Sequence, residues 1–316
     1  MNVYTWKYFV NKLLILFKRR ELWTIGIYKL PYFDLYDFPV FNDLVKIGES
    51  GIRKNKDYQS VAADPFLFSK AGVLYLFYEA KTDFCVGEIW LKSFTSDGSV
   101  TCHGCVLKES FHLSYPQVVE FDGVEYMLPE SASSGKVLLY KADSFPEKWS
   151  LARVLIDKPL VDPSLVVRPE GLYLLATTPD NDMKLYFSKT IHDEFIDCGH
   201  IISNEIPKAK SARNAGRPID IGNELCRLYQ DCSVGYGKSI GIKRIENISV
   251  SKYEETDVTD DIFKIRPKWM REGYHHLSIV KHDGFTYVAI DGKCFDSYVN
   301  TVMLLFIKIY YYFISR

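Results

Sequence analysis

The chain has 316 residues, of which 47% are hydrophobic and 25% charged, and its formal net charge is −1. This composition is typical of a globular protein, and the near-neutral charge argues against nucleic acid as a partner, because phosphate binding needs clustered positive charge. Its seven cysteines have no regular spacing, which argues against a secreted disulfide framework and favours a reducing, cytoplasmic compartment.

The N-terminal segment, residues 1–22, predicts a basic amphipathic helix. Its first twenty residues contain five Lys or Arg and no acidic residue, with apolar residues at helical spacing. The apolar run at 13–17 is too short for the core of a signal peptide. Two interpretations stay open: peripheral binding to the inner face of an anionic membrane, or a helix packed on the rest of the chain.

A hairpin pattern follows an aromatic and proline-rich stretch, residues 23–45, that we interpret as irregular. In residues 61–79 an Asp-Pro pair opens an apolar strand, a tight turn follows, and a second alternating strand ends at Glu79. The pattern recurs, with openings at Asp64, Tyr115, Asp162, Arg217 and His276. The separations of 51, 47, 55 and 59 residues match the period of a four-stranded propeller blade.

The sequence therefore predicts an all-β fold: a five-bladed β-propeller over residues 23–300 with short N- and C-terminal flanking segments. The C-terminal segment, residues 301–316, is apolar but short, and Lys308 interrupts it, so it cannot span a bilayer alone. Either this tail lies in a membrane interface or it supplies the strand that closes the propeller ring.

The candidate site lies at the mouth of the central channel, because the innermost strand of every blade lines that channel and its ends converge there. Polar residues at these strand ends fall into two groups. The predicted catalytic residues are Asp64, Glu130 and Asp162. The predicted substrate-binding residues are Glu79, His112, Tyr115, Arg213, Arg217, Asp231 and His276.

The side chains of Arg213 and Arg217, four residues apart, fit a phosphate or carboxylate ligand, and a salt bridge to the channel acids is the alternative. His112 is either a ligand-binding imidazole or a structural hydrogen-bonding group. His275 and His276 are adjacent, and neighbouring residues of a strand point to opposite faces, so we expect at most one of them to face the channel.

The motifs for metals and nucleotides are incomplete. Cys102 and Cys105 form one C-x-x-C pair without a second pair at zinc-site spacing, so we predict no metal site. The stretch 235–239 faintly resembles a phosphate-binding loop, but Cys232 stands where the first glycine is required. No cofactor is predicted, and a nucleotide sugar or a lipid-linked sugar is the class of donor that fits.

In combination, several motifs resemble the N-terminal domain of plant glucosamine inositolphosphorylceramide transferases and its bacterial relatives. They include Ala-Asp-Pro-Phe at 63–66, His-Leu-Ser-Tyr-Pro at 112–116, Met-Leu-Pro-Glu-Ser at 127–131, Ala-Arg-Asn-Ala-Gly-Arg at 212–217 and His-His-Leu at 275–277. The resemblance implies a five-bladed propeller in glycan or glycolipid assembly. The plant proteins also have a C-terminal glycosyltransferase domain, which has no counterpart in this sequence.

A more distant resemblance is to the five-bladed arabinanase and fructosidase superfamily, which also has an Ala-Asp-Pro on its first blade. That likeness implies that Asp64 is a general base, that Asp162 tunes acidity and that Glu130 is the acid. In the superfamily the acid follows the second aspartate, whereas Glu130 precedes Asp162.

Three functions follow from these patterns. The first is sugar transfer from an activated donor in surface glycan or glycolipid biosynthesis, where Asp64 or Glu130 deprotonates the acceptor and Arg213 and Arg217 hold a donor phosphate. The second is a non-catalytic glycan-binding propeller that docks a partner enzyme, and the third is a glycosidase. The expected partners are a glycan or sugar-phosphate ligand and other polysaccharide-assembly enzymes, with peripheral membrane contact left open.

Overall fold

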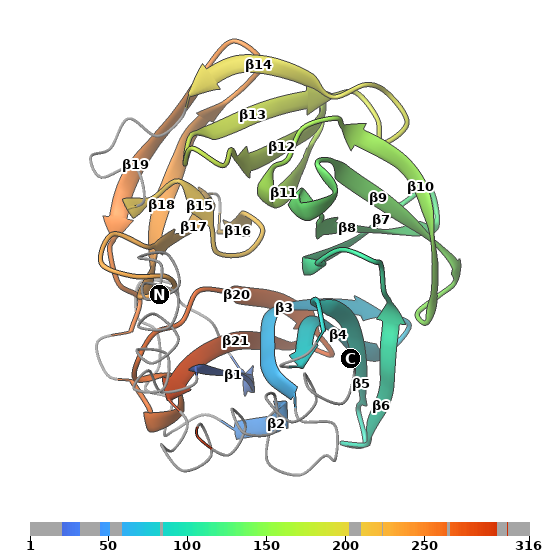
Figure 1. The fold of residues 1–316 in the computed structure, drawn as a ribbon. Coiled ribbons are helices and arrows are strands. Elements are labelled where there is room, and N and C mark those ends of the chain that lie inside the picture. Colours follow the sequence, from blue (N-terminus) through green and yellow to red (C-terminus); the bar gives the residue numbers. More distant parts are fainter. Residues whose placement is uncertain are drawn as a thin grey trace, which may run out of the picture.

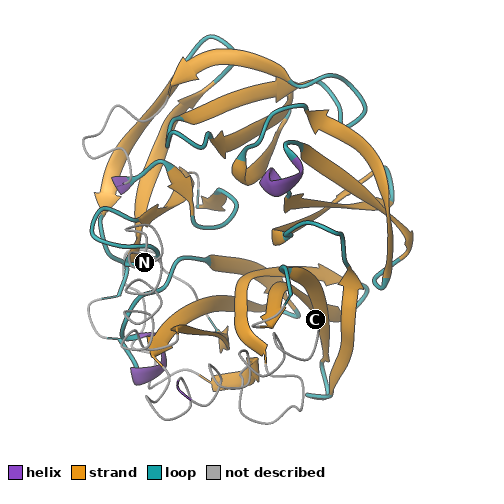
Figure 2. Cartoon of the chain, in the orientation of Figure 1, coloured by secondary structure: helices purple, strands orange, loops and turns teal. Residues whose placement is uncertain are grey.

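The computed structural model describes residues 21–31, 45–50, 59–82, 85–201, 210–222, 224–263 and 266–295, together with residue 302. Strands arranged around a centre and joined by turns make up most of this part of the chain (Figure 1, Figure 2). The predicted basic helix and nearly all of the apolar tail lie outside the described residues, so both stay predictions. Within the described residues, no helix is long and apolar enough to cross a membrane.

Three of the four sheets are antiparallel groups of consecutive strands. One consists of β7 (Ser114–Phe121), β8 (Val124–Glu130), β9 (Val137–Ser144) and β10 (Lys148–Ile156). The next consists of β11 (Val161–Arg168), β12 (Gly171–Thr177), β13 (Met183–Ser188) and β14 (Ile196–Ile201). The third consists of β15 (Arg213–Asn214), β16 (Ile219–Ile221), β17 (Glu224–Asp231), β18 (Ser239–Ile248) and β19 (Tyr253–Thr259). Short 3-10 helices are η2 (Ala132–Ser134) and η4 (Lys268–Met270).

The largest sheet has eight strands and contains two such groups. The first group is β3 (Gln59–Lys70), β4 (Val73–Thr82), β5 (Glu88–Thr95) and β6 (Val100–Leu107). The second is β20 (Leu277–His282), β21 (Phe285–Phe295), β1 (Glu21–Leu30) and β2 (Val45–Ser50). A single parallel pair, Trp23 with Val61, joins the two groups. The all-β prediction is confirmed.

Strand β1 corrects the prediction that residues 23–45 are irregular. It pairs antiparallel with β21 along its whole length, from Glu21 opposite Phe295 to Leu30 opposite Thr286. Most of its side chains are buried on both faces, so its sequence lacks the alternation that indicates a strand. Strand β21 therefore has β20 on one side and β1 on the other.

The hydrophobic core lies between neighbouring strand groups. Leu128 of β8 and Leu174 of β12 belong to one buried cluster, and Phe77 of β4 and Met127 of β8 belong to another. Apolar contact between the groups, and not only hydrogen bonding within each sheet, therefore holds the arrangement together.

Three of the innermost strands contain the same backbone irregularity. Asp64, Tyr115 and Asp162 have φ values of 50°, 51° and 49°, and each precedes a proline. At each place the pairing with the second strand skips two residues. A bulge of this kind removes the side chain from regular alternation, and a positive φ is strained for residues other than glycine. Three predicted site residues thus lie in equivalent bulges, where they do not take part in the regular strand pairing.

Candidate functional site

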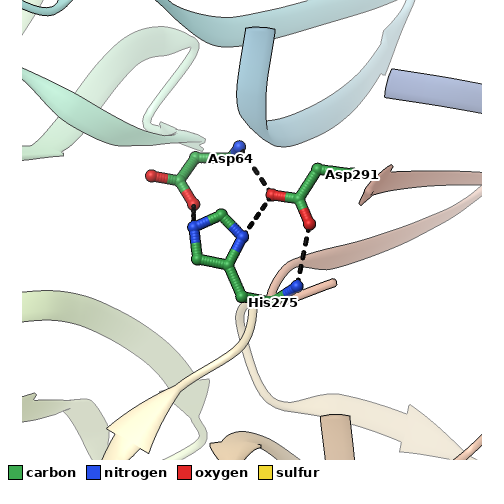
Figure 3. A group of neighbouring side chains, drawn as sticks. All are labelled: Asp64, His275 and Asp291. Carbon is green, nitrogen blue, oxygen red and sulfur yellow. Dashed lines mark hydrogen bonds and ion pairs between the residues drawn. The ribbon is translucent and has the colours of Figure 1, made fainter. Parts of the chain in front are cut away.

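A buried triad is formed by Asp64 of β3, Asp291 of β21 and His275, which precedes β20 (Figure 3). The Nδ1 atom of His275 lies 2.6 Å from Oδ2 of Asp291, and its Nε2 atom lies 3.5 Å from Oδ1 of Asp64. The imidazole is therefore placed between two carboxylates. The other carboxylate oxygen of Asp64 points away from the histidine (Figure 3).

Backbone groups hold the carboxylate of Asp291 in place. Its Oδ1 atom accepts hydrogen bonds from the backbone N–H groups of His275 (2.9 Å) and His276 (3.0 Å). Its Oδ2 atom accepts one from the backbone N–H of Asp64 at 3.1 Å. Asp291 therefore connects the bulge of β3 to the segment that precedes β20.

The triad is charged despite its burial. Burial, the largest single effect, raises the pKa of Asp64, but His275, His276 and Arg213 together outweigh it and lower that pKa to about 2. Burial likewise opposes the charge of His275, but the carboxylates of Asp291 and Asp64 raise its pKa to about 9. At neutral pH His275 is therefore an imidazolium cation beside an ionised Asp64.

The three side chains also offer one ligand atom each within 4.8 Å of one another, as a metal site would. However, a histidine ligand must be neutral, and both ring nitrogens of His275 face carboxylate oxygens in a setting that raises its pKa to about 9. The geometry fits a protonated histidine better than a metal ion.

Glu79, near the end of β4, is a second buried carboxyl next to the triad. Burial and the negative charge of Asp64 raise the pKa of Glu79 to about 8. The Nε2 atom of His112 lies 3.5 Å from Oε1 of Glu79, while Nδ1 accepts a hydrogen bond from the backbone N–H of Gly87 at 3.0 Å. Asp64 is therefore ionised at neutral pH, whereas Glu79 keeps its proton.

Gly87 permits this approach of His112, because a Cβ atom at Gly87 would lie 2.5 Å from the imidazole. Since Nδ1 of His112 accepts the Gly87 N–H, a neutral His112 carries its proton on Nε2, directed at Glu79. His112 thus acts both as a structural group and as a partner of the carboxyl.

A second cluster contains Asp162, Arg213 and Glu130. The guanidinium of Arg213 binds Asp162 through two hydrogen bonds, from Nε to Oδ2 (2.7 Å) and from Nη2 to Oδ1 (3.0 Å). Gln230 donates a third hydrogen bond to Asp162 at 3.0 Å. Of the two interpretations of Arg213, ligand binding or a salt bridge to channel acids, the structure has the salt bridge.

Glu130 binds the bulge of the neighbouring group in the way that Asp291 binds Asp64. Its Oε2 atom accepts a hydrogen bond from the backbone N–H of Asp162 at 3.1 Å. Burial and the negative charge of Asp162 raise the pKa of Glu130 well above its usual range. Glu130 therefore connects the strand group of β8 to that of β11 through its hydrogen bond with the backbone of Asp162.

An exposed aromatic ring lies beside both clusters. The ring centroid of Tyr236 is 5.0 Å from that of His275 and 5.9 Å from that of Trp23, and the guanidinium of Arg213 lies 5.2 Å from the Tyr236 ring. Tyr236 nevertheless keeps 45% of its surface exposed. Asp231 accepts two hydrogen bonds from Ser233, at 2.9 and 2.6 Å, and so shapes the turn that leads to Tyr236.

The remaining predicted residues lie elsewhere. Tyr115 is fully buried, and its hydroxyl accepts a hydrogen bond from the backbone N–H of Gly216 (2.9 Å) and lies 2.7 Å from Oγ of Ser164. It links three strand groups and faces no open space. Arg217 is not among the contacts of either cluster and lines a separate cavity.

His276 departs from the expectation that only one of the two adjacent histidines faces the centre. Its Nδ1 atom lies 3.5 Å from Oδ1 of Asp64, the same oxygen that His275 approaches. The alternation does not apply because β20 begins only at Leu277. The ring of His276 is fully buried and packs against Phe66 at 4.5 Å, which is a structural environment.

Four site residues were not predicted from the sequence: His275, Asp291, Gln230 and Tyr236. The signal for Asp291 was present, since it is the seventh residue of the second strand of its hairpin, as Glu79 and Glu130 are of theirs. Tyr236 lies in the glycine-rich stretch 235–239, which faintly resembles a phosphate-binding loop and gives no other signal of a site.

Comparison with known sequences gives consistent matches. Residues 36–293 match the family model of "Glucosamine inositolphosphorylceramide transferase 1, N-terminal". The protein of that name from Oryza sativa subsp. japonica is 32% identical over 258 residues, which are 77% of this chain and 34% of the relative. The Arabidopsis thaliana protein is 30% identical over 272 residues, which are 81% of this chain and 35% of the relative. The chain spans about a third of the length of these curated relatives.

Solved structures resemble the fold at low sequence identity. An α-L-arabinofuranosidase from Podospora anserina superposes with a TM-score of 0.55 at 8% identity, over 75% of this chain and 93% of the other. The catalytic domain of an α-L-arabinofuranosidase from Coprinopsis cinerea has a TM-score of 0.54 at 12% identity, over 76% and 93%. These likenesses concern the fold alone, which is propeller-like. By its sequence, the chain belongs to the family of the N-terminal domain of glucosamine inositolphosphorylceramide transferase 1.

Proposed function

We propose that the chain is a five-bladed β-propeller that transfers a sugar from an activated donor to a glycan or glycolipid. The five strand groups support the blade number, since each begins at one of the recurring hairpins, with β20, β21, β1 and β2 as the fifth. The names of the relatives support the reaction class, because they describe transferases that act on an inositolphosphorylceramide.

The observation that carries the proposal is the opposite protonation of two neighbouring carboxyls. The pKa of Asp64 is lowered to about 2 and that of Glu79 is raised to about 8. A pair of carboxyls with separated pKa values is typical of sites that break or form glycosidic bonds. In our proposal Asp64 is the fixed anion opposite the positive charge that develops on the sugar ring, and Glu79 carries the proton.

This assignment revises the role expected for Asp64. A carboxylate with a pKa of about 2 is a weak base, whereas a group that titrates near the working pH transfers protons efficiently. Glu79 meets that condition, and it takes the role of acid or base that the sequence suggested for Asp64 or Glu130. The exposed ring of Tyr236 supplies a face on which the apolar side of a sugar packs.

For the acceptor we propose an inositolphosphorylceramide or a related glycolipid, and for the donor an activated glucosamine. The test is to incubate the purified chain with uridine-diphosphate-linked glucosamine or N-acetylglucosamine and inositolphosphorylceramide in detergent micelles, and to detect the product by mass spectrometry. We expect Asp64→Asn and Glu79→Gln each to reduce the rate by about a hundredfold or more. The matched control is Glu194→Gln, which replaces an exposed glutamate and leaves the rate unchanged.

The state of Arg213 favours a second candidate, a glycan-binding propeller without catalysis. One edge of its guanidinium, formed by Nε and Nη2, is already bound to Asp162, so less of it is left for a donor phosphate. Saccharide binding that is measurable by calorimetry, without product from any donor, would favour this second function over transfer. A glycosidase is the third candidate and predicts release of a free sugar in the same assay.

We also propose that the protein acts at the cytoplasmic face of a membrane, as the basic N-terminal segment suggests. Removal of residues 1–20 is expected to move the protein from the membrane pellet to the soluble fraction. An unchanged distribution would support the alternative of a helix packed on the propeller.

A further inference from the structure

A cavity of about 750 Å³ lies at the far end of the innermost strands from the triad. In β7, β11 and β20, the site residues lie at or before the start of the strand, and the cavity is lined by later residues such as Val119, Arg168 and Lys281. At about 3.3 Å per residue, separations of four to six residues correspond to about 13–20 Å. The cavity is therefore distinct from the candidate active site.

The walls of the cavity combine apolar side chains with polar and charged ones. They include the side chains of Val119, Leu165, Ile219, Ile279 and Phe285. The amide of Gln117 also lines the cavity, but it donates to the carbonyl oxygen of Leu165 (3.0 Å) and accepts from its N–H (2.8 Å). The amide of Gln117 is thus already hydrogen-bonded to the backbone of Leu165. The charged side chains therefore determine which polar ligand the cavity accepts.

Positive charge in the cavity exceeds negative charge. Arg168 and Asp220 neutralise each other through two hydrogen bonds of 3.0 and 3.3 Å. Arg217 and Lys281 also line the cavity, and neither makes a hydrogen bond or ion pair with any described residue. Burial lowers the pKa of Arg217, and the negative charge of the nearby Asp220, which is already bound to Arg168, offsets only part of that effect.

We propose that this cavity is a binding site for a phosphate ester, with the guanidinium of Arg217 on the phosphate oxygens and the apolar side chains around the remainder of the ligand. The planar fork of an arginine matches a phosphate, and the volume is that of a small-molecule site. The ligand comes either from a soluble sugar phosphate or from the headgroup of a phospholipid. The proposal goes beyond sugar transfer and does not depend on it.

Calorimetry with glucose 1-phosphate tests the soluble source, and flotation with phosphatidylcholine vesicles that contain phosphatidylinositol tests the lipid source. We expect Arg217→Met, which keeps the length of the side chain but removes the charge, to weaken binding roughly tenfold or more. Asp220→Asn removes the neighbouring negative charge and is expected to strengthen binding. The matched control is Arg271→Met, which removes an exposed arginine that does not line the cavity.

Asp64→Asn is expected to reduce sugar transfer but to leave binding of the phosphate ester unchanged. This variant therefore distinguishes a failure of the binding proposal from a failure of the proposed transfer. Binding of glucose 1-phosphate that is sensitive to Arg217→Met supports the soluble source, and sensitivity in flotation alone supports the headgroup. The proposal is overturned if neither probe binds, or if Arg217→Met and Arg271→Met bind equally well. If Arg217→Met fails to fold, Asp220→Asn provides the test. The proposal is then overturned if Asp220→Asn does not raise the affinity for either probe.

Discussion

Replacement of Glu79 by glutamine is expected to stabilise the protein at neutral pH while it abolishes transfer. Glutamine has the shape and neutrality of the protonated glutamate. The pKa of Glu79 rises from 4.5 in the unfolded chain to about 8 in the folded protein. Between these pH values the folded protein retains a proton that the unfolded chain releases, so the contribution of Glu79 to stability is lost as pH rises.

The magnitude follows from the size of this window. From pH 4.5 to pH 7, an interval of about 2.5 pH units, the unfolded chain releases the proton of Glu79 and the folded protein keeps it. At about 1.36 kcal/mol per unit, this lowers the free energy of unfolding by about 3 kcal/mol. The side chain is 10% exposed, so solvent screens the effect little. Glu79→Gln lacks this term, and its stability relative to the wild type is expected to rise by about 3 kcal/mol across that range.

Urea unfolding at pH 4.5, 6, 7 and 8 measures this difference directly. Because the other titrating groups are common to both proteins, subtraction isolates Glu79, and Glu194→Gln controls for the loss of one carboxyl. A difference between Glu79→Gln and the wild type that does not change with pH would refute the reasoning. Glu79 would then be ionised in the folded protein, and the proposed division of roles with Asp64 would fail.

Three further outcomes are expected. Tyr115→Phe removes the hydroxyl that accepts the Gly216 N–H and is expected to cost about 1–3 kcal/mol in urea unfolding without a change in saccharide affinity. Asp291→Asn leaves the buried His275 cation poorly compensated and is expected to cost about 3–5 kcal/mol. This cost should be largest below pH 6.5 and shrink towards pH 9, because the raised pKa of His275 stabilises the protein only while the histidine is protonated. Tyr236→Ala is expected to lower saccharide affinity several-fold in calorimetry, with only a small drop in melting temperature, because the ring packs against His275 and Trp23 but the residue is 45% exposed.

Much of the fold was predictable because each hairpin is a local pattern. The Asp-Pro or Tyr-Pro openings, the glycine turns and the alternating second strands all lie within about twenty residues of one another. Strand β1 could not be recognised in the same way. Its partner β21 lies at the other end of the described chain, and its burial on both faces removes the alternation. A pairing between segments so far apart in the sequence produces no pattern that can be recognised within either segment.

The site was predictable where it depended on position along the repeat. Asp64 and Asp162 lie at equivalent bulges of innermost strands, Glu130 ends a second strand, and the structure brings Glu130 into contact with the backbone of Asp162. Arg217 differs because Gly216 breaks the innermost strand with a φ of 128°, and a Cβ there would lie 2.2 Å from the carbonyl oxygen of Leu277. Arg213 therefore lies on β15, whereas Arg217 lies in the connection to β16. A spacing of four residues does not bring the two side chains together.

The pairing of β1 with β21 has a consequence for biosynthesis. The ribosome releases β1 well before β21, so the edge of β1 that pairs with β21 stays unpaired while the intervening residues, more than 200, are made. Unpaired edges of this kind attract other chains, and contacts of long range form slowly. A nascent or truncated chain that lacks Phe285–Phe295 is therefore expected to depend on chaperones. The fifth strand group is therefore expected to form only after β21 has been made and has paired with β1.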